Sequence, residues 1–384
     1  MKNLLKWLFF SGSLLWIVSC GSSRKLPTSS ADYEMVEVTA SNQHFHFFNA
    51  VLEPQEISPH VQVVRDDSSR QNLLFALNQQ QKNIAVFDLK GKGLLKTIPL
   101  EALGEHPAVN SFFVHNLDSI FVNTRYSNKV VLMDISGVPQ NSFDIELKDE
   151  RGDQVIVTSD HHARIFYQDG ALFLRWLPSR IIRQQQDFPE QIYVKITADT
   201  QMMLAQSPEH LALQNGYYRN LNNLLGNQTL GLTALNVHQK LIYTSFFEPQ
   251  IYAFESVDSI VDIHHLPSKF IDSIPQDAPL EDAEEATTNL AHYGSFFYDS
   301  FRDLYYRIAL PKTAEEDAAQ YFYLMVISSD WRILNEIPLD AQYYHPQVLI
   351  PTPDGILLAK KPFLDANFWQ GNIRYFELLK LTIE

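Results

Sequence analysis

The feature that most constrains the fold is a pair of apolar runs that recurs along the chain. In residues 118–135 an apolar run is followed by a polar turn and then by a second apolar run. Residues 72–89 show the same order. Two short apolar runs on either side of a polar turn predict a β-hairpin. A hairpin that recurs predicts an all-β fold built from repeats.

The hairpin recurs in six units that lie 46 to 70 residues apart. Their first strands begin near Asn72, Asp118, Gly170, Lys240, Asp303 and Gly355. The apolar residues are consecutive rather than alternating, which predicts strands that are buried on both faces. The spacing fits the ~40 to 50 residues of a four-stranded propeller blade with added loops. The sequence therefore predicts a six-bladed β-propeller.

The last unit ends one strand short of a complete blade. The segment from Glu34 to Thr39, which is apolar at alternate positions, predicts the missing strand. Its pairing with the last unit would close the ring and remove the exposed sheet edges that promote aggregation. We therefore expect one propeller domain over residues 32–384, with its last blade closed by an N-terminal strand.

The first residues have the composition of an export signal. Lys2 and Lys6 precede an apolar run over residues 7–18. This run is shorter than the ~20 apolar residues of a transmembrane helix, which favours a cleaved leader.

Residues 17–20, Ile-Val-Ser-Cys, resemble the lipobox of bacterial lipoproteins. The resemblance implies cleavage before Cys20 and attachment of acyl chains to it, with residues 1–19 as the signal peptide. Because Cys20 is the only cysteine, a disulfide framework is excluded. Residues 20–31 are mostly small and polar, which predicts a flexible tether. We expect an outer-membrane lipoprotein that faces the periplasm, with display on the cell surface as the alternative, and with the membrane as one partner.

The net charge of the chain limits the classes of partner that it can bind. The chain has 45 acidic and 30 basic residues, with a net charge of −15. Nucleic acid is therefore not an expected partner, because binding phosphate backbones needs clustered Lys and Arg. Two acidic segments, residues 275–286 and 311–320, are interpreted as solvated loops at the rim, with a cation or basic-partner site as the alternative.

One segment resembles a known family. Tyr298-Asp299 and Arg302 precede residues 304–307, Leu-Tyr-Tyr-Arg, in a six-unit chain with a lipobox. This layout resembles the TolB-like six-bladed propeller lipoproteins of unknown function in Bacteroidota. The resemblance implies a fold and no activity.

Arg307 is unusual for its position within the repeat. The equivalent residues of the other units are uncharged: Ala76, Val122, Leu174, Thr244 and Ala359. An arginine between blades needs hydrogen-bonding partners. Either Asp299 or another carboxylate holds Arg307 structurally, or Arg307 faces a ligand. Arg175 and Lys360, one position further along their units, are the other candidate ligand-binding residues.

The histidines do not form a metal-binding pattern. His161-His162 and His264-His265 are adjacent pairs whose members point to opposite faces of a strand, and His44 and His46 supply only two ligands on one face. A metal site needs three or four converging ligands, so neither a metal nor another cofactor is predicted. No nucleophile elbow or phosphate-binding loop is present in the sequence, and no catalytic residue is predicted.

Three Asp-Ser-Ile triplets resemble the O-glycosylation sequon of Bacteroidota. They contain Ser119, Ser259 and Ser273. Ser119 opens a predicted strand, so Ser259 and Ser273 are the expected sites.

These features together favour a lipid-anchored binding or scaffolding module of the cell envelope without its own catalysis. Its partner would be an envelope protein or a glycan. The alternative is a six-bladed hydrolase or lyase whose site is built from loops at the mouth of the channel.

Overall fold

The computed structural model describes residues 36–48, 51, 54–55, 57–66, 68–104, 109–124, 128–148, 152–157, 159, 165–178, 193–197, 200–203, 232–237, 240–245, 248–256, 259–271, 291–311, 321–360 and 375–383. All of them belong to the compact unit of residues 33–384. Within this part of the chain, no helix has the length and apolar character needed to cross a membrane.

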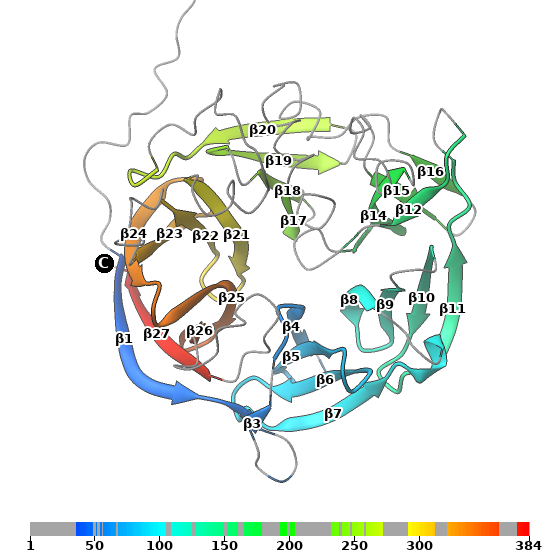
Figure 1. Ribbon diagram of the computed structural model, residues 1–384, viewed down its shortest axis with the longest axis horizontal. Helices are drawn as coiled ribbons and strands as arrows, with labels where there is room; N and C mark the ends of the chain where they lie inside the picture. Colours follow the sequence, from blue (N-terminus) through cyan, green and yellow to red (C-terminus); the bar gives the residue numbers. More distant parts are fainter. Residues whose placement is uncertain are drawn as a thin grey trace, which may run out of the picture. The chain divides into compact units, whose positions relative to one another are not determined.

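The described residues form six antiparallel sheets of four or five strands and one small two-stranded sheet (Figure 1). The first three sheets comprise β4 (Val61–Asp66), β5 (Gln71–Asn78), β6 (Asn83–Asp88) and β7 (Leu94–Pro99); β8 (Val109–Asn116), β9 (Ser119–Thr124), β10 (Lys129–Met133) and β11 (Pro139–Asp144); and β12 (Val155–Val157), β13 (Phe166–Gln168), β14 (Ala171–Pro178), β15 (Tyr193–Ile196) and β16 (Gln201–Met203).

The other three comprise β17 (Leu232–Val237), β18 (Lys240–Ser245), β19 (Gln250–Ser256) and β20 (Ser259–His265); β21 (His292–Asp299), β22 (Leu304–Leu310), β23 (Tyr321–Ser328) and β24 (Ile333–Asp340); and β25 (Tyr344–Thr352), β26 (Gly355–Lys360), β27 (Tyr375–Ile383) and β1 (Val36–Phe45). The small sheet pairs β2 (Phe47–Phe48) with β3 (Pro54–Gln55), and a 3-10 turn spans Glu101–Leu103.

The second strands β5, β9, β22 and β26 are buried on both faces. Six of the seven residues of β22 are buried, and β5 has five buried residues in succession. Strands β7 and β11, the outermost of their sheets, are in contrast largely exposed. The consecutive apolar residues of the sequence repeats therefore mark strands that lie between two neighbouring sheets.

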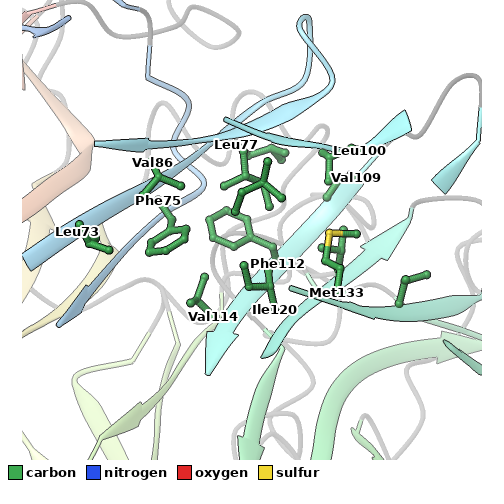
Figure 2. Packing of buried hydrophobic residues seen from close by; sticks show 14 residues of the cluster. Leu73, Phe75, Leu77, Val86, Leu100, Val109, Phe112, Val114, Ile120 and Met133 are labelled. Atoms are coloured by element: carbon green, nitrogen blue, oxygen red, sulfur yellow. The ribbon is translucent and has the colours of Figure 1, made fainter. Parts of the chain in front are cut away.

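Neighbouring sheets share hydrophobic cores. Figure 2 shows one core, in which Phe75 and Val86 of the first sheet pack with Phe112 and Ile120 of the second. A second core joins β8–β11 to β12–β16, a third joins β17–β20 to β21–β24, a fourth joins β21–β24 to the sheet of β25–β27 and β1, and a fifth joins that last sheet to β4–β7. The first and last sheets of the chain are thus packed against each other.

The last sheet is built from both ends of the described chain. The predicted strand after Glu34 is present as β1, which pairs antiparallel with β27 from Val36 opposite Ile383 to Phe45 opposite Phe376. Asn335 of the neighbouring sheet donates a hydrogen bond to the Val36 carbonyl over 2.7 Å. Strand β1 is therefore bound to two sheets.

Glycine is required where β26 begins. Gly355 has a φ of +151°, and a Cβ at this position would lie 2.2 Å from the carbonyl oxygen of Leu379. Only a residue without a side chain fits, because neither the backbone conformation nor the space suits a Cβ.

The six predicted first strands are confirmed, while two details of the sheets differ from the sequence prediction. The sequence of residues 143–147, Phe-Asp-Ile-Glu-Leu, predicts a further strand after the second hairpin, but β11 spans Pro139–Asp144. Its residues are mostly exposed and polar, so they carry little apolar signal. In the third sheet β14 pairs with two short strands, β12 along one half and β13 along the other. Strand β13 is only three residues long, which is too short for a periodic pattern.

Candidate functional site

Arg307 is fully buried between the sheets β21–β24 and β17–β20. Its Nη2 donates a hydrogen bond of 2.7 Å to the backbone carbonyl of Glu248, which lies between β18 and β19. Its guanidinium also lies 3.7 Å from the ring centre of Tyr293 on β21. A cation over an aromatic face is attracted by the electrons of the ring, and more strongly so when water is excluded.

The carboxylate of Glu248 interacts electrostatically with the buried Arg307. It accepts a hydrogen bond of 2.8 Å from the Tyr252 hydroxyl. Burial raises the pKa of Glu248, and the nearby Tyr252 and Arg307 oppose that shift. Burial also lowers the pKa of Arg307 to about 10, against the attraction of Tyr293 and Glu248. The arginine remains charged at neutral pH.

A second buried carboxylate lies further along the same interface. Glu336 of β24 accepts the backbone N–H of Lys269 at 3.2 Å from each carboxylate oxygen. The Tyr293 hydroxyl accepts the backbone N–H of Ser268. Tyr293 therefore contacts Arg307 through its ring and the 268–269 segment through its hydroxyl. Burial raises the pKa of Glu336.

Lys360, the second candidate, forms an ion pair at the end of β26. Its Nζ lies 2.9 Å from Oε2 of Glu377 on β27. The same oxygen accepts the hydroxyl of Tyr344 at 3.0 Å. Lys360 and Glu377 are paired within their own sheet, so the contacts of Lys360 are those of a structural residue.

Arg175, the third candidate, is buried in β14. Its backbone N–H donates to the Ser159 hydroxyl over 3.0 Å. Arg175, Arg307 and Lys360 belong to three different sheets. Their roles in ligand binding stay predictions.

Asp299 has partners other than Arg307. Its carboxylate accepts Arg302 Nη1 at 2.8 Å and the Tyr306 hydroxyl at 2.8 Å. Arg302 in turn donates to the carbonyls of Thr352 and Pro353, at the turn between β25 and β26. The segment that resembles the propeller lipoproteins is therefore a connection between two adjacent sheets.

A groove among the described residues lies at the junction of the first and last sheets. We call it the basic groove; its volume is about 840 Å³, and it lies beside the turn at 352–354, the hairpin ends at 70–72 and 88–92, and the strands β1 and β27. The buried side chains of Leu89, Leu357 and Leu378 contribute to its wall.

Four cations border the basic groove: Arg70, Lys90, Lys92 and Lys380. Only two acids, Asp88 and Asp354, accompany them. Among the ion pairs of the described residues, none involves any of these four cations. The groove is thus locally basic on a chain whose net charge is −15.

Lys92 is the least exposed of the four cations. Its Nζ lies 4.3 Å from the ring centre of Phe45. Burial lowers the pKa of Lys92, and Asp354 and Asp88 oppose the shift. The Asp88 carboxylate is itself occupied, since it accepts the backbone N–H groups of Lys90 and Gly91.

The sequence reasoning missed the basic groove. Its residues come from five separate segments, and the four cations are divided among three of them. The nearest signal in the sequence is residues 90–92, Lys-Gly-Lys, in a chain otherwise rich in acids. This pattern alone is also typical of an ordinary surface turn.

Some of the predicted site residues lie outside the described part of the chain, and others lie on β20. Cys20, Ser273, His161 and His162 lie outside the described residues. Ser259 begins β20, and His264 of that strand stacks on Trp331 with ring centres 4.5 Å apart. Burial lowers the pKa of His264. Within the described ranges, no three His, Cys, Asp or Glu residues converge as metal ligands.

The fold and these sites define an all-β protein of successive antiparallel sheets, with buried charges at its sheet interfaces and one basic groove. Comparison of sequences identifies its family. The chain belongs to the family described as "Domain of unknown function (DUF4221)", whose profile matches residues 28–338. A search among curated proteins found no match.

A solved structure of a member of the same family supports the fold. A crystal structure of a DUF4221 family member from Bacteroides vulgatus is 14% identical, covers 92% of this chain and 100% of its own, and has a TM-score of 0.67. A streptogramin B lyase is 12% identical over 92% of this chain and 100% of its own, with a TM-score of 0.42. A luciferin-regenerating enzyme is 10% identical over 90% and 97%, with a TM-score of 0.43.

Proposed function

We propose that this chain is a lipid-anchored, six-bladed β-propeller that binds a partner in the cell envelope and has no catalysis of its own. In this proposal the six sheets are the blades, and β1 completes the last blade and closes the ring. Five shared cores between sheets and the pairing of β1 with β27 support the arrangement. The resemblance to TolB-like lipoproteins agrees with it.

The basic groove is the observation that carries the binding role. Buried charges at the sheet interfaces have partners inside the protein: Arg307 with Glu248 and Tyr293, and Lys360 with Glu377. The groove differs, because its cations make no ion pair with described residues. Solvent-accessible charges beside an apolar wall suit a binding site.

The location follows from the N-terminal sequence. The lipobox resemblance of residues 17–20 supports acylation of Cys20 and attachment to the outer membrane on its periplasmic side. Two or more acyl chains give stable anchoring, whereas one gives only marginal binding. The expected partner is an envelope protein or glycan, and nucleic acid is not expected.

The test combines partner recovery with a screen for turnover. Acylated protein is affinity-purified from membranes, and any recovered component is then rebound in purified form. The same preparation is incubated with glycan and peptide substrates. A stoichiometric partner with no turnover is the expected result. Turnover that a single substitution abolishes would overturn the binding role in favour of a hydrolase or lyase.

A further inference from the structure

We infer that the basic groove binds a ligand through a phosphate group. The inference rests on the proposed binding function and specifies the chemistry of the ligand. It concerns Arg70, Lys90, Lys92 and Lys380 together with the apolar wall beside them.

The first step is the charge of the groove. Four cations face two acids, and Asp88 already accepts two backbone N–H groups of its own turn. Opposite charges at close range attract most strongly where water is partly excluded. An anion is therefore the ligand that this groove favours, although the chain as a whole repels anions.

The second step is the kind of anion. A phosphate monoester carries about two negative charges on one compact group, whereas a carboxylate carries one. Arg70 offers the planar fork that binds phosphate oxygens in pairs, and each lysine offers a mobile point charge. Cations from the hairpin ends at 70 and 90–92 and from β27 lie around the same groove. A compact, multiply charged group satisfies several of them at once.

The third step is the part of the ligand beyond the phosphate. The buried side chains of Leu89, Leu357 and Leu378 form an apolar surface next to the cations. The volume of about 840 Å³ is large for a free phosphate ion and falls within the range of ~300–1,000 Å³ that is typical of organic ligands. A phosphate ester with an organic moiety fits this combination.

Lys92 supports the inference independently of the charge count. The side chain is half-buried against Phe45, and burial lowers its pKa. A buried ammonium is stabilised by an added negative charge more than an exposed one is. Ligand binding should therefore raise the pKa of Lys92.

Two sources supply such a phosphate: a soluble phosphate ester or the headgroup of a phospholipid. Lys380 lies opposite Thr39 in the pairing of β27 with β1, near the start of the described chain at Val36. An acylated protein is held at a membrane, so phospholipid headgroups are an available source of phosphate. The phosphate chemistry is the same in both cases.

The experiment uses the chain from Gly21 onward, which lacks the acylated cysteine and cannot bind vesicles through acyl chains, and a double substitution, Lys90→Gln with Lys380→Gln. Both side chains are exposed, so the fold should tolerate the changes. The control is Lys129→Gln with Lys148→Gln, which removes the same charge from outside the groove. Inositol hexakisphosphate and vesicles containing one fifth phosphatidylglycerol are titrated by calorimetry and co-sedimentation, beside a hexaglutamate peptide.

We expect the control to bind at least one phosphate probe like the wild type, and the groove variant to bind it about tenfold more weakly. Raising the salt from 50 to 300 mM should weaken wild-type binding, because exposed charges are screened. Binding of the inositol phosphate alone identifies a soluble ester as the source, and binding of the vesicles alone identifies a headgroup. Either result supports the inference.

No binding of either phosphate probe, equal binding by the groove variant, or stronger binding of hexaglutamate would overturn it. If an envelope partner still binds the purified protein after such a result, the proposed binding function is retained and only the phosphate inference is rejected. Turnover in the substrate screen would overturn that function instead, without changing the phosphate titration.

Discussion

Arg307 shows how one buried charge is held in this protein. Its guanidinium contacts a backbone carbonyl and the face of Tyr293, with the Glu248 carboxylate nearby. The sequence identified the residue as anomalous, but it did not identify these partners. They lie on β21 and between β18 and β19, and only the packing of two sheets brings them to the arginine.

Replacing Arg307 with Met tests whether the buried charge is structural. Met keeps most of the volume but leaves the Glu248 carbonyl and carboxylate without a cation. We expect the free energy of unfolding to fall by about 2–4 kcal/mol, because breaking a buried charged interaction leaves the remaining polar groups desolvated. Urea denaturation measures the change. Arg332→Met, in an exposed ion pair, should stay within about 0.5 kcal/mol. Unchanged stability of the Arg307 variant would instead favour a ligand-binding role.

Glu336 gives a prediction about pH. Burial raises its pKa in the folded state, so the folded protein binds this proton more tightly than the unfolded chain does. The contribution of Glu336 to the free energy of unfolding therefore becomes more favourable as the pH falls from 7 toward the ordinary pKa of a glutamate. In Glu336→Gln that contribution is missing.

We expect the stability of Glu336→Gln relative to the wild type to decrease between pH 7 and pH 4. Denaturation curves at several pH values measure it, with the exposed Glu146→Gln as the control. A relative stability that is constant with pH would contradict the prediction.

At the scale of the secondary-structure elements, β1 is the strand with the most separated partners. It comes from the start of the described chain and pairs with β27 at its end, and its Val36 carbonyl is bound by Asn335. Local sequence alone predicts a strand here. The partner depends on where the last sheet lies.

Deleting the chain up to residue 45 should expose the edge of β27 and the buried face that Val36 covers. We expect loss of a single cooperative melting transition, or aggregation, because an open edge pairs with other chains. Deleting only the predicted signal and tether, residues 1–31, is the matched control and should leave melting unchanged. A protein that begins at His46 and melts like this control would contradict the role of β1.

At the scale of the whole molecule, the predicted lipid anchor and the basic groove are both proposed to interact with components of the cell envelope. A protein with a net charge of −15 gains little from general attraction to anionic membranes. Attachment is therefore expected to depend on acylation, with the groove adding only local selectivity.

Cys20→Ala should abolish attachment, because Cys20 is the only cysteine of the chain. We expect the variant to remain unprocessed or to appear in the soluble fraction, and to incorporate no labelled fatty acid. Fractionation and labelling in cells measure both outcomes. Incorporation of label into the variant would contradict the prediction.

Intact-mass measurement of the mature wild type also tests glycosylation of Ser259 and Ser273.

The sequence by itself determined the position of one strand in each sheet. Consecutive apolar residues in six units placed the second strand of every sheet, because a strand between two sheets must be apolar on both faces. Short or exposed strands such as β13 and β11 left no comparable pattern. Tertiary structure alone decided the contacts between units: Arg307 with Glu248, Arg302 with the turn at 352–354, and the four cations around one groove. The physical reason is distance along the chain, since residues from separate sheets become neighbours only when those sheets pack.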